Sequence, residues 1–509
     1  MSEPGGTSRR LPGRVLTILA LEPDAPAIEF EGRWHSWREL SMVIDRLDES
    51  LKNAGVGRQA PIGMLLRNTP SMVGAMLAAV ATERSIVTLN PHQGDAKIAR
   101  DILEVRAPVI LAAARDWERD AVRSAAREST ALGIVLTGDP IDPVRVVPGL
   151  ERPGPGPHRG PAPGVAVEML TSGTTGPPKR IPLATSVFER TILAAGDHYR
   201  KKGDGDRSPR LKQGVAIVSS PFVHMSGLFR TLLNVCEGRK MALLPRFAVE
   251  PWVALVRRHR PRAVSLVPAA LRMVLDADVE PADLSSIEVV TSGTAKLEPE
   301  IQIAFERRFA IPVLPSYGAT EFAGGVAGWT LTLHREWGEK KRGSVGRPQP
   351  GREIRVVAQD SGEPVVANET GLIEIRSGGE ATWQRTTDLG RIDTDGFLWI
   401  VGRSDDAILR GGFKIMPDDV RRALLLHPAV REASVVGLSD PRLGQVPVAA
   451  VELHDSAAVG GDEILAFARE HLTSYQAPAA IRIVPALPRT PSLKVSQEGV
   501  RALFEDGSS

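Results

Sequence analysis

The sequence predicts an α/β protein with a large N-terminal domain, residues 1–404, and a small α+β C-terminal domain, residues 405–509. Short apolar strand patterns alternate with amphipathic helix patterns as far as residue 318, which predicts parallel sheets covered on both faces. From about residue 345 short strands and turns replace that alternation, which indicates a small β subdomain. A compact α+β pattern of about 100 residues, near the usual size of a domain, follows Gly412.

The first parallel-sheet subdomain is predicted from three strands and three helices. Residues 34–55 place Leu40, Val43, Ile44 and Leu47 at helical spacing, and Gly55 ends that helix. The elements that follow are the strand PIGMLL (61–66), the helix 70–82, the strand SIVTLN (85–90), a helix near 96–103 and the strand APVILAA (107–113).

A second alternating half follows a linker. Residues 151–164 are dense in proline and glycine and predict a loop. The strands then expected are VAVEML, GVAIVSS, MALLP, AVSLVP, IEVVTSG and IPVLPSYG. TSGT closes a strand at 171–174 and again at 291–294, which predicts glycine turns at strand ends, where α/β folds bind ligands.

The rest of the chain reads as short strands. In the β subdomain Asp395-Gly396 between apolar runs indicates a hairpin. The C-terminal pattern is helix 417–426, strands ASVVGL and VPVAAVEL, helix 462–472 and strand AAIRIV.

Composition argues against several classes of protein. Lys and Arg number 63 against 61 Asp and Glu, a net charge of +2, so nothing indicates a nucleic-acid binder. Cys236 is the only cysteine, which excludes an internal disulfide and a cysteine-based zinc site. The apolar run from Met72 is about half of a membrane span, and no signal peptide is evident. We therefore expect a cytoplasmic protein without a transmembrane segment.

The stretch LTSGTTGPPKR, residues 170–180, has the composition of a phosphate-binding loop. Glycines let backbone N–H groups approach an anion, hydroxyls donate hydrogen bonds, and a lysine adds a charge. The pattern is not that of a Walker loop, because Pro177 and Pro178 separate Gly176 from Lys179. An ordinary surface turn rich in Gly, Ser and Pro is the alternative reading of this loop alone.

Seven motifs in order resemble the adenylate-forming superfamily, which includes acyl-CoA synthetases. They are TSGTTGPPK, PFVHMSGL (221–228), TSGTA (291–295), YGATE (317–321), TTDLG (386–390), GRSDDAILRGGFKIMPDDV (402–420) and LPRTPSLK (487–494). The resemblance implies that a carboxylate attacks the α-phosphate of ATP to give an acyl-adenylate and pyrophosphate. A thiol, commonly that of coenzyme A, then displaces AMP to form a thioester. ATP, Mg²⁺ and coenzyme A are the implied cofactors.

The resemblance also assigns roles to residues in the large domain. Glu321 is the implied Mg²⁺ ligand and Thr320 the hydroxyl beside the phosphates, while His224 is either a gate of the acyl site or ordinary packing. The residues expected around the triphosphate are Thr171, Ser172, Gly173, Thr174, Thr175 and Lys179. Those expected around adenine and ribose are Gly293, Thr294, Ala295, Tyr317, Gly318, Asp388 and Arg403.

The small domain is expected to be mobile and to serve the two steps with different faces. Asp405 corresponds to the family's hinge. Lys494 resembles the lysine that bridges carboxylate and α-phosphate in the first step. Gly411 and Gly412 resemble the turn that serves the thiol in the second step, with Lys414 adding a phosphate contact.

Three features depart from the family pattern. Leu493 stands where a glycine usually precedes the lysine, and Thr387 stands where a glycine usually precedes the aspartate. The segment 376–386 is shorter than in family members generally. We expect these changes to affect rate and domain docking more than nucleotide binding.

The segment PFVHMSGL predicts the kind of acid. Amino-acid-activating relatives normally carry an aspartate near this point, whereas here His224 lies among apolar and small residues, so the charge of a free amino acid would stay unpaired. A hydrophobic acid, fatty or aromatic, is expected, with Gly293, Gly324 and Gly325 leaving space for it. The main hypothesis is an AMP-forming acid:CoA ligase. Loading of a separate carrier protein, and a nucleotide-binding protein that has lost catalysis, stay open, as does a homodimer.

Overall fold

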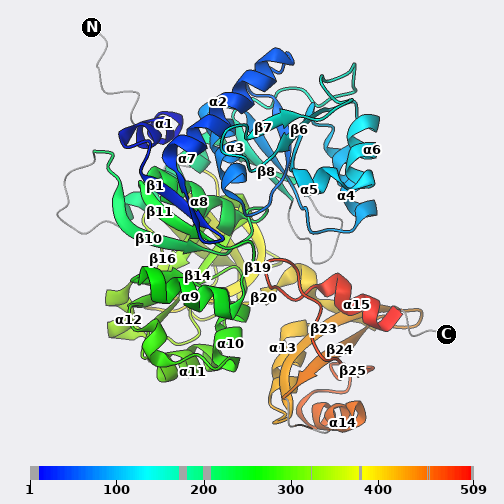
Figure 1. Cartoon of the computed structure of the whole chain (residues 1–509). Helices are drawn as coiled ribbons and strands as arrows, with labels where there is room; N and C mark the ends of the chain where they lie inside the picture. Colours follow the sequence, from blue (N-terminus) through cyan, green and yellow to red (C-terminus); the bar gives the residue numbers. More distant parts are fainter. Residues whose placement is uncertain are drawn as a thin grey trace.

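The computed structural model describes residues 11–170, 180–198, 208–322, 324–377, 381–454, 457 and 459–505. Figure 1 shows sheets and helices of the first 400 or so residues packed together, with the C-terminal segment forming a smaller lobe beside them. The predicted fold class is confirmed.

A mostly parallel sheet forms the first unit, in the order β7-β6-β5-β3-β4-β8-β9. Its strands are β3 (Pro61–Leu65), β4 (Ser85–Leu89), β5 (Val109–Ala113), β6 (Leu132–Leu136), β7 (Val144–Val146), β8 (Val165–Leu170) and β9 (Arg180–Ala184). Its helices are α2 (Trp37–Asn53), α3 (Pro70–Ala81), α4 (Asp95–Val105), α5 (Ala114–Trp117) and α6 (Asp120–Glu128). One apolar cluster joins α2 and α3 to this sheet and another joins α4 and α6, so both faces are covered.

The helix predicted over 34–55 begins three residues later than expected. Ser36 is extended, with φ −82° and ψ 166°, and its side chain accepts a hydrogen bond from the Glu39 backbone N–H, so it caps α2. The residues before it form a strand, β2 (Arg33–Ser36). The capping bond therefore fixes the start of the helix.

The second half of the large domain is divided between two sheets. β10 (Lys212–Val218) and β11 (Arg239–Leu243) join β1 (Pro26–Phe30) and β2 in the order β10-β11-β1-β2. The other sheet contains β12 (Ala263–Ser265), β13 (Val289–Ser292), β14 (Val313–Ala319), β15 (Gly324–Gly328) and β16 (Arg347–Pro348), in that order. The helices of this half are α1 (Leu11–Leu21), α7 (Thr185–His198), α8 (Met225–Cys236), α9 (Val249–His259), α10 (Pro268–Asp276), α11 (Pro299–Phe309) and α12 (Leu331–Trp337), with 3₁₀ turns η1 (Pro281–Leu284) and η2 (Thr320–Phe322).

An antiparallel sheet forms the β subdomain, with strands β17 (Arg352–Val357), β18 (Gly371–Ser377), β19 (Gln384–Ile392) and β20 (Leu398–Arg403). The predicted hairpin is confirmed, since Gly396 turns the chain between β19 and β20 with φ +80°. The 3₁₀ turn η3 (Ser404–Asp406) leads on to the small lobe.

The small lobe is an α+β unit, as predicted. Its strands run in the order β22-β21-β24-β23, and β25 pairs with β24. They are β21 (Ile408–Arg410), β22 (Phe413–Ile415), β23 (Val430–Asp440), β24 (Gly444–Leu453) and β25 (Ile481–Ile483). The helices are α13 (Pro417–Leu425), α14 (Gly461–His471) and α15 (Gln497–Glu505). In the part of the chain that the structure describes, no helix is long and apolar enough to cross a membrane.

Candidate active site

A cleft of about 2270 Å³ lies where the large domain meets the small lobe. Its walls come from strand ends of three sheets, from α8 and from the C-terminal segment before α15. It brings together the predicted residues His224, Gly293, Thr294, Ala295, Tyr317, Gly318, Glu321, Asp388, Arg403 and Lys494. Segments far apart in the sequence therefore converge on one space.

The hydroxyl-rich loop at 171–179, with Thr171, Ser172, Gly173, Thr174, Thr175 and Lys179, lies outside the described residues. Its two flanking residues, Leu170 and Arg180, pair across the end of the antiparallel strands β8 and β9. Leu170 lines the cleft. The side chain of Thr320, at the start of η2, is likewise not described.

The turn after β13 forms a wall of backbone along the cleft. A Cβ on Gly293 would lie 2.7 Å from the Ser316 side-chain oxygen, so only glycine lets the two strands approach this closely. Thr294 follows with φ +71°, a conformation that residues other than glycine rarely adopt. This tight turn lines the cleft and is compatible with the expected role beside a flat base.

Tyr317 and Asp388 are in direct contact. The Tyr317 hydroxyl donates a hydrogen bond of 2.5 Å to the Asp388 carboxylate. Burial, together with the negative charge of Asp388, raises the pKa of Tyr317, so its proton stays in place. The Asp388 carboxylate therefore accepts a hydrogen bond from within the protein.

Arg403 is hydrogen-bonded to Asp405, the residue of the predicted hinge. It pairs with Asp388 in the register of β19 and β20, and its guanidinium donates to the Asp405 carboxylate at 2.9 and 2.8 Å. It also donates to the Thr387 hydroxyl at 2.7 Å. Where the family usually has glycine, the hydroxyl of Thr387 thus adds a hydrogen bond that positions Arg403. Threonine at position 387 is therefore compatible with the geometry of the site.

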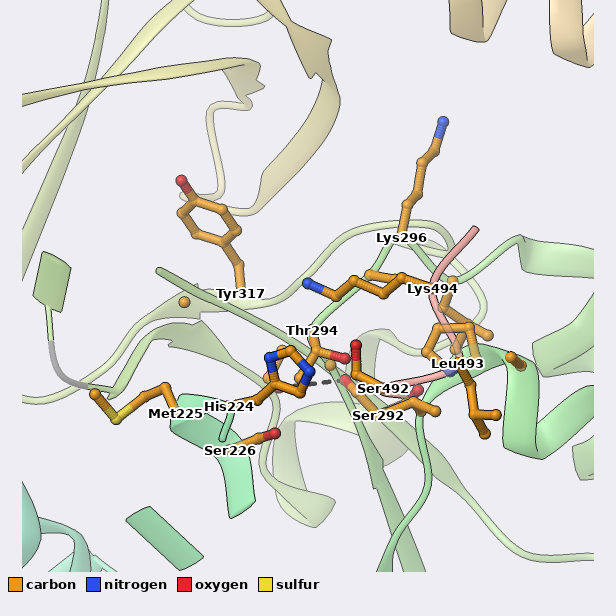
Figure 2. A pocket seen from close by; sticks show the side chains of 18 of the residues that line it. His224, Met225, Ser226, Ser292, Thr294, Lys296, Tyr317, Ser492, Leu493 and Lys494 are labelled. Carbon is orange, nitrogen blue, oxygen red and sulfur yellow. Dashed lines mark hydrogen bonds between the residues drawn. The ribbon is translucent and has the colours of Figure 1, made fainter. Parts of the chain in front are cut away.

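Lys494 extends into the cleft from the small lobe, with its side chain directed toward Tyr317 (Figure 2). Burial lowers its pKa, the nearby positive charge of Arg403 lowers it further, and Asp388 opposes the shift. A buried ammonium for which no ion pair is recorded among the described residues is well placed to attract an anion. This arrangement fits the expected contact with carboxylate and α-phosphate.

Leu493, the second departure, is held in an unusual conformation. Its φ is +65°, the region in which glycine is favoured, so the usual glycine of the family has a physical explanation. Leu493 also packs against the apolar core formed by α9, α10 and α11 of the large domain. The leucine therefore adds an apolar contact between the lobes at the expense of backbone strain.

These opposing effects predict an order of stability for two variants. Leu493→Ala loses the packing and keeps the strain, whereas Leu493→Gly loses the packing and relieves the strain. We expect Leu493→Ala to be less stable than Leu493→Gly by about 1 kcal/mol, measured by urea unfolding. An alanine variant as stable as the glycine variant would show that the backbone at 493 carries no strain.

His224 is a buried neutral histidine. Burial lowers its pKa to about 4, and Lys494 and His92 add to the shift. Its Nε2 atom has no hydrogen-bond partner among the described residues. His224 precedes the first turn of α8 with φ −107° and ψ 149°. It is therefore an uncharged lining residue of the cleft with one buried ring nitrogen that is unpartnered in the described part of the chain.

Gly411, Gly412 and Lys414 are not brought into the cleft. The two glycines, with φ +56° and +89°, turn the chain between β21 and β22. Lys414 donates to the Gln359 side chain at 2.9 Å, in the β subdomain. In this structure the side of the small lobe that carries Lys494 faces the cleft, so the Gly411–Gly412 turn lies outside the cleft.

Gly324 and Gly325, two of the glycines expected to leave space for the acid, line the cleft but are closely packed on the side where a side chain would begin. A Cβ on Gly324 would lie 2.9 Å from the Thr191 methyl group, and one on Gly325 would lie 2.6 Å from the Gln349 amide. The space beside these glycines is already filled by neighbouring side chains. Glycine spacing alone does not reveal this, because Thr191 and Gln349 come from distant segments.

Sequence reasoning missed polar residues of the cleft. Arg230 on α8 lines it and donates to the Thr291 hydroxyl at 3.3 Å. Lys296 and Glu298 line it directly after the Gly293 turn, opposite Asp418 and Arg421 of α13. Their position directly after the TSGTA motif was the one feature of the sequence that could have indicated that Lys296 and Glu298 line the cleft.

Two family models match the chain. The model for AMP-binding enzymes matches residues 18–381. The chain belongs to the AMP-binding enzyme family. The model for the C-terminal domain of these enzymes matches residues 420–494. The resemblance inferred from the seven motifs is therefore confirmed, as is the prediction of an enzyme of the AMP-forming acid–thiol ligase type.

Curated relatives and solved structures match over nearly the whole length. An indoleacetate–CoA ligase of Aromatoleum aromaticum is 28% identical over 95% of this chain and 96% of its own. A 2-succinylbenzoate–CoA ligase of Bacillus velezensis is 29% identical over 97% of this chain and 98% of its own. The structure of o-succinylbenzoate coenzyme A synthetase (MenE) from Bacillus subtilis, in complex with ATP and magnesium ion, has a TM-score of 0.75 at 24% identity and covers 96% of this chain and 99% of that one.

Proposed function

We propose that the enzyme activates an aromatic carboxylic acid with ATP through an acyl-adenylate and transfers the acyl group to coenzyme A, giving an acyl-CoA thioester, AMP and pyrophosphate. The observation that carries this proposal is the presence of Glu321, Asp388 and Lys494 in one cleft at the junction of the lobes. These side chains have the chemistry that a metal ion, a ribose and an α-phosphate require.

The residues of the cleft are suited to a nucleotide with a divalent cation. Among the described residues, no group of three His, Cys, Asp or Glu side chains is placed to hold a metal ion by itself. Mg²⁺ usually keeps waters and binds to one or two carboxylates together with substrate phosphates. Glu321 supplies such a carboxylate, and the bound cation would neutralise charge on the phosphates.

Protein groups account for the rest of the first step. Lys494 supplies a positive charge where two anions have to approach each other. The tight turn at Gly293 and Thr294 presents backbone to the base, and Asp388 accepts hydrogen bonds from the sugar. Neutral His224 borders the acyl side without adding charge, which suits an apolar acid.

Side chains packed against two glycines of the cleft suit a compact acid better than a long chain. Thr191 and Phe229 lie against Gly324, and the Gln349 amide lies against Gly325. Two relatives are named for acids that contain an aromatic ring, indoleacetate and 2-succinylbenzoate. Their names as CoA ligases also favour coenzyme A over a carrier protein as the acceptor.

A panel of acids tests the proposal. With ATP, Mg²⁺ and coenzyme A, we expect aryl acids such as phenylacetate and benzoate to exceed hexadecanoate in kcat/KM by about tenfold or more, because each misfit in an apolar pocket is worth roughly 1–3 kcal/mol. Pyrophosphate and thioester are both followed. Preference for hexadecanoate contradicts the aromatic assignment, and pyrophosphate without CoA thioester favours a carrier protein. No turnover with any acid contradicts the enzyme assignment.

A further inference from the structure

We propose that Asp418 and Arg421 are positioning residues that hold the small lobe with Lys494 in the cleft. They do so by binding Lys296 and Glu298, which follow the Gly293–Ala295 wall in the sequence. We call these four residues the clasp. The inference rests on the proposed function only in the meaning given to the Lys494 position, since the clasp itself is a set of contacts between the lobes.

The clasp is a partly buried network of charges. The Lys296 ammonium lies 2.5 Å from the Asp418 carboxylate, and the Arg421 guanidinium donates to the Glu298 carboxylate. Arg421 also donates to Asp418 at 3.0 Å, which joins the two pairs. The side chains of Arg421, Glu298 and Asp418 are only 16–19% exposed. Charges in such a network interact more strongly than isolated surface pairs.

The clasp residues favour their charged states. Burial opposes charge on Asp418, but Arg421 and Lys296 outweigh it and lower its pKa. Burial likewise opposes charge on Arg421, but Glu298 and Asp418 outweigh it and raise its pKa. Removing one partner would leave the others charged and partly buried, which is unfavourable.

The clasp connects the wall of the nucleotide site to the small lobe. Lys296 and Glu298 are separated by Leu297, which is buried in the core of the large domain, so their backbone is anchored. Figure 2 shows Lys296 pointing away from Tyr317 and Lys494. Helix α13, which carries Asp418 and Arg421, moves with the small lobe. Any rotation that brings the Gly411–Gly412 turn to the cleft therefore has to separate the two pairs.

The clasp is also suited to opening. Arg421 keeps Asp418 as a partner on its own helix, and Glu432 of the same lobe lies 3.9 Å from it. Arg421 therefore still has a negatively charged neighbour after its contact with Glu298 is broken. Two positions of similar free energy are what a domain that alternates between tasks requires.

Asp419 gives a matched control for Asp418. It is the next residue in the first turn of the same helix and carries the same charge. It bonds to Arg422, which is also on α13, and both of these side chains are exposed by 42% or more. Asp418→Asn and Asp419→Asn therefore change net charge and helix dipole alike, but only the first breaks a contact between the lobes.

Lobe position is measured first, by double electron–electron resonance between spin labels on Ile141→Cys and Leu426→Cys. These positions are 78% and 65% exposed, whereas native Cys236 is buried and its pKa is raised to about 12, which keeps its thiol unreactive. With ATP and Mg²⁺ added, the wild type should show one main distance between the labels. We expect Asp418→Asn and Arg421→Gln to lower the population at this distance, relative to the population at all other distances, by about tenfold, and Asp419→Asn to leave it unchanged. Clasp variants that match Asp419→Asn overturn the proposal.

The half-reactions then separate positioning from general damage. We expect Asp418→Asn and Lys296→Gln to slow pyrophosphate formation by about tenfold and to leave thioester formation from preformed adenylate unchanged or faster. The double variant should be little slower than the Asp418→Asn variant, because both changes break the same Lys296–Asp418 pair. Equal loss in both half-reactions overturns the proposal. If no acid is activated by the wild type, the proposed function fails, while the distance measurement still decides the clasp.

Discussion

Lys494→Ala is expected to abolish adenylate formation while sparing thioester formation from preformed adenylate. Lys494 is a cation that the small lobe places in the cleft, and it lies beside Asp388 and Arg403 rather than near the Gly411–Gly412 turn. Loss of a charge aimed at developing negative charge slows such steps by about 10²–10³-fold. Pyrophosphate release and thioester formation are measured separately.

Lys340→Ala is the control for this variant, because Lys340 is an exposed lysine of the large domain that does not line the cleft. It should retain both half-reactions. Equal loss of both half-reactions in Lys494→Ala would contradict the role assigned to Lys494, because that role belongs to the first step alone.

Asp388→Asn is expected to raise the KM for ATP by about tenfold or more, since hydrogen bonds to a charged group contribute roughly 1.5–3 kcal/mol. A Tyr317 variant provides a comparison, because the Tyr317 hydroxyl donates a hydrogen bond to the Asp388 carboxylate. Tyr317→Phe keeps an aromatic face for the base and frees the carboxylate for the sugar, so its KM for ATP should be no higher than that of the wild type. Steady-state kinetics with varied ATP measures both.

Asp360→Asn, in an exposed turn of the β subdomain, controls for the loss of one negative charge. A Tyr317→Phe variant that loses ATP affinity as strongly as Asp388→Asn would mean that the hydroxyl itself holds the nucleotide. That result would reverse the roles proposed for the two residues.

Much of the site could be predicted because each motif ends a strand or opens a turn. The Gly293 turn and the YGATE segment lie at such ends, and apolar patterns locate strands well. Sequence patterns also identified Leu493 as unusual. They could not show that its side chain packs on the opposite lobe, because that contact joins residues far apart in the chain.

The remaining differences have the same origin. The start of α2 depends on a hydrogen bond that the Ser36 side chain accepts, and the pairing of β10 and β11 with β1 joins segments far apart in the chain. The filled space beside Gly324 and Gly325 depends on Thr191 and Gln349. The clasp requires the orientation of the small lobe, which no local pattern determines.

The central claim is that the segments lining the cleft bind one nucleotide together. A crystal structure with ATP and Mg²⁺ tests this claim most directly. The claim predicts adenine between the Gly293–Ala295 wall and Tyr317, ribose on Asp388, and the α-phosphate within reach of Lys494. A nucleotide bound elsewhere, or one that leaves Asp388 and Lys494 without contact, would contradict it.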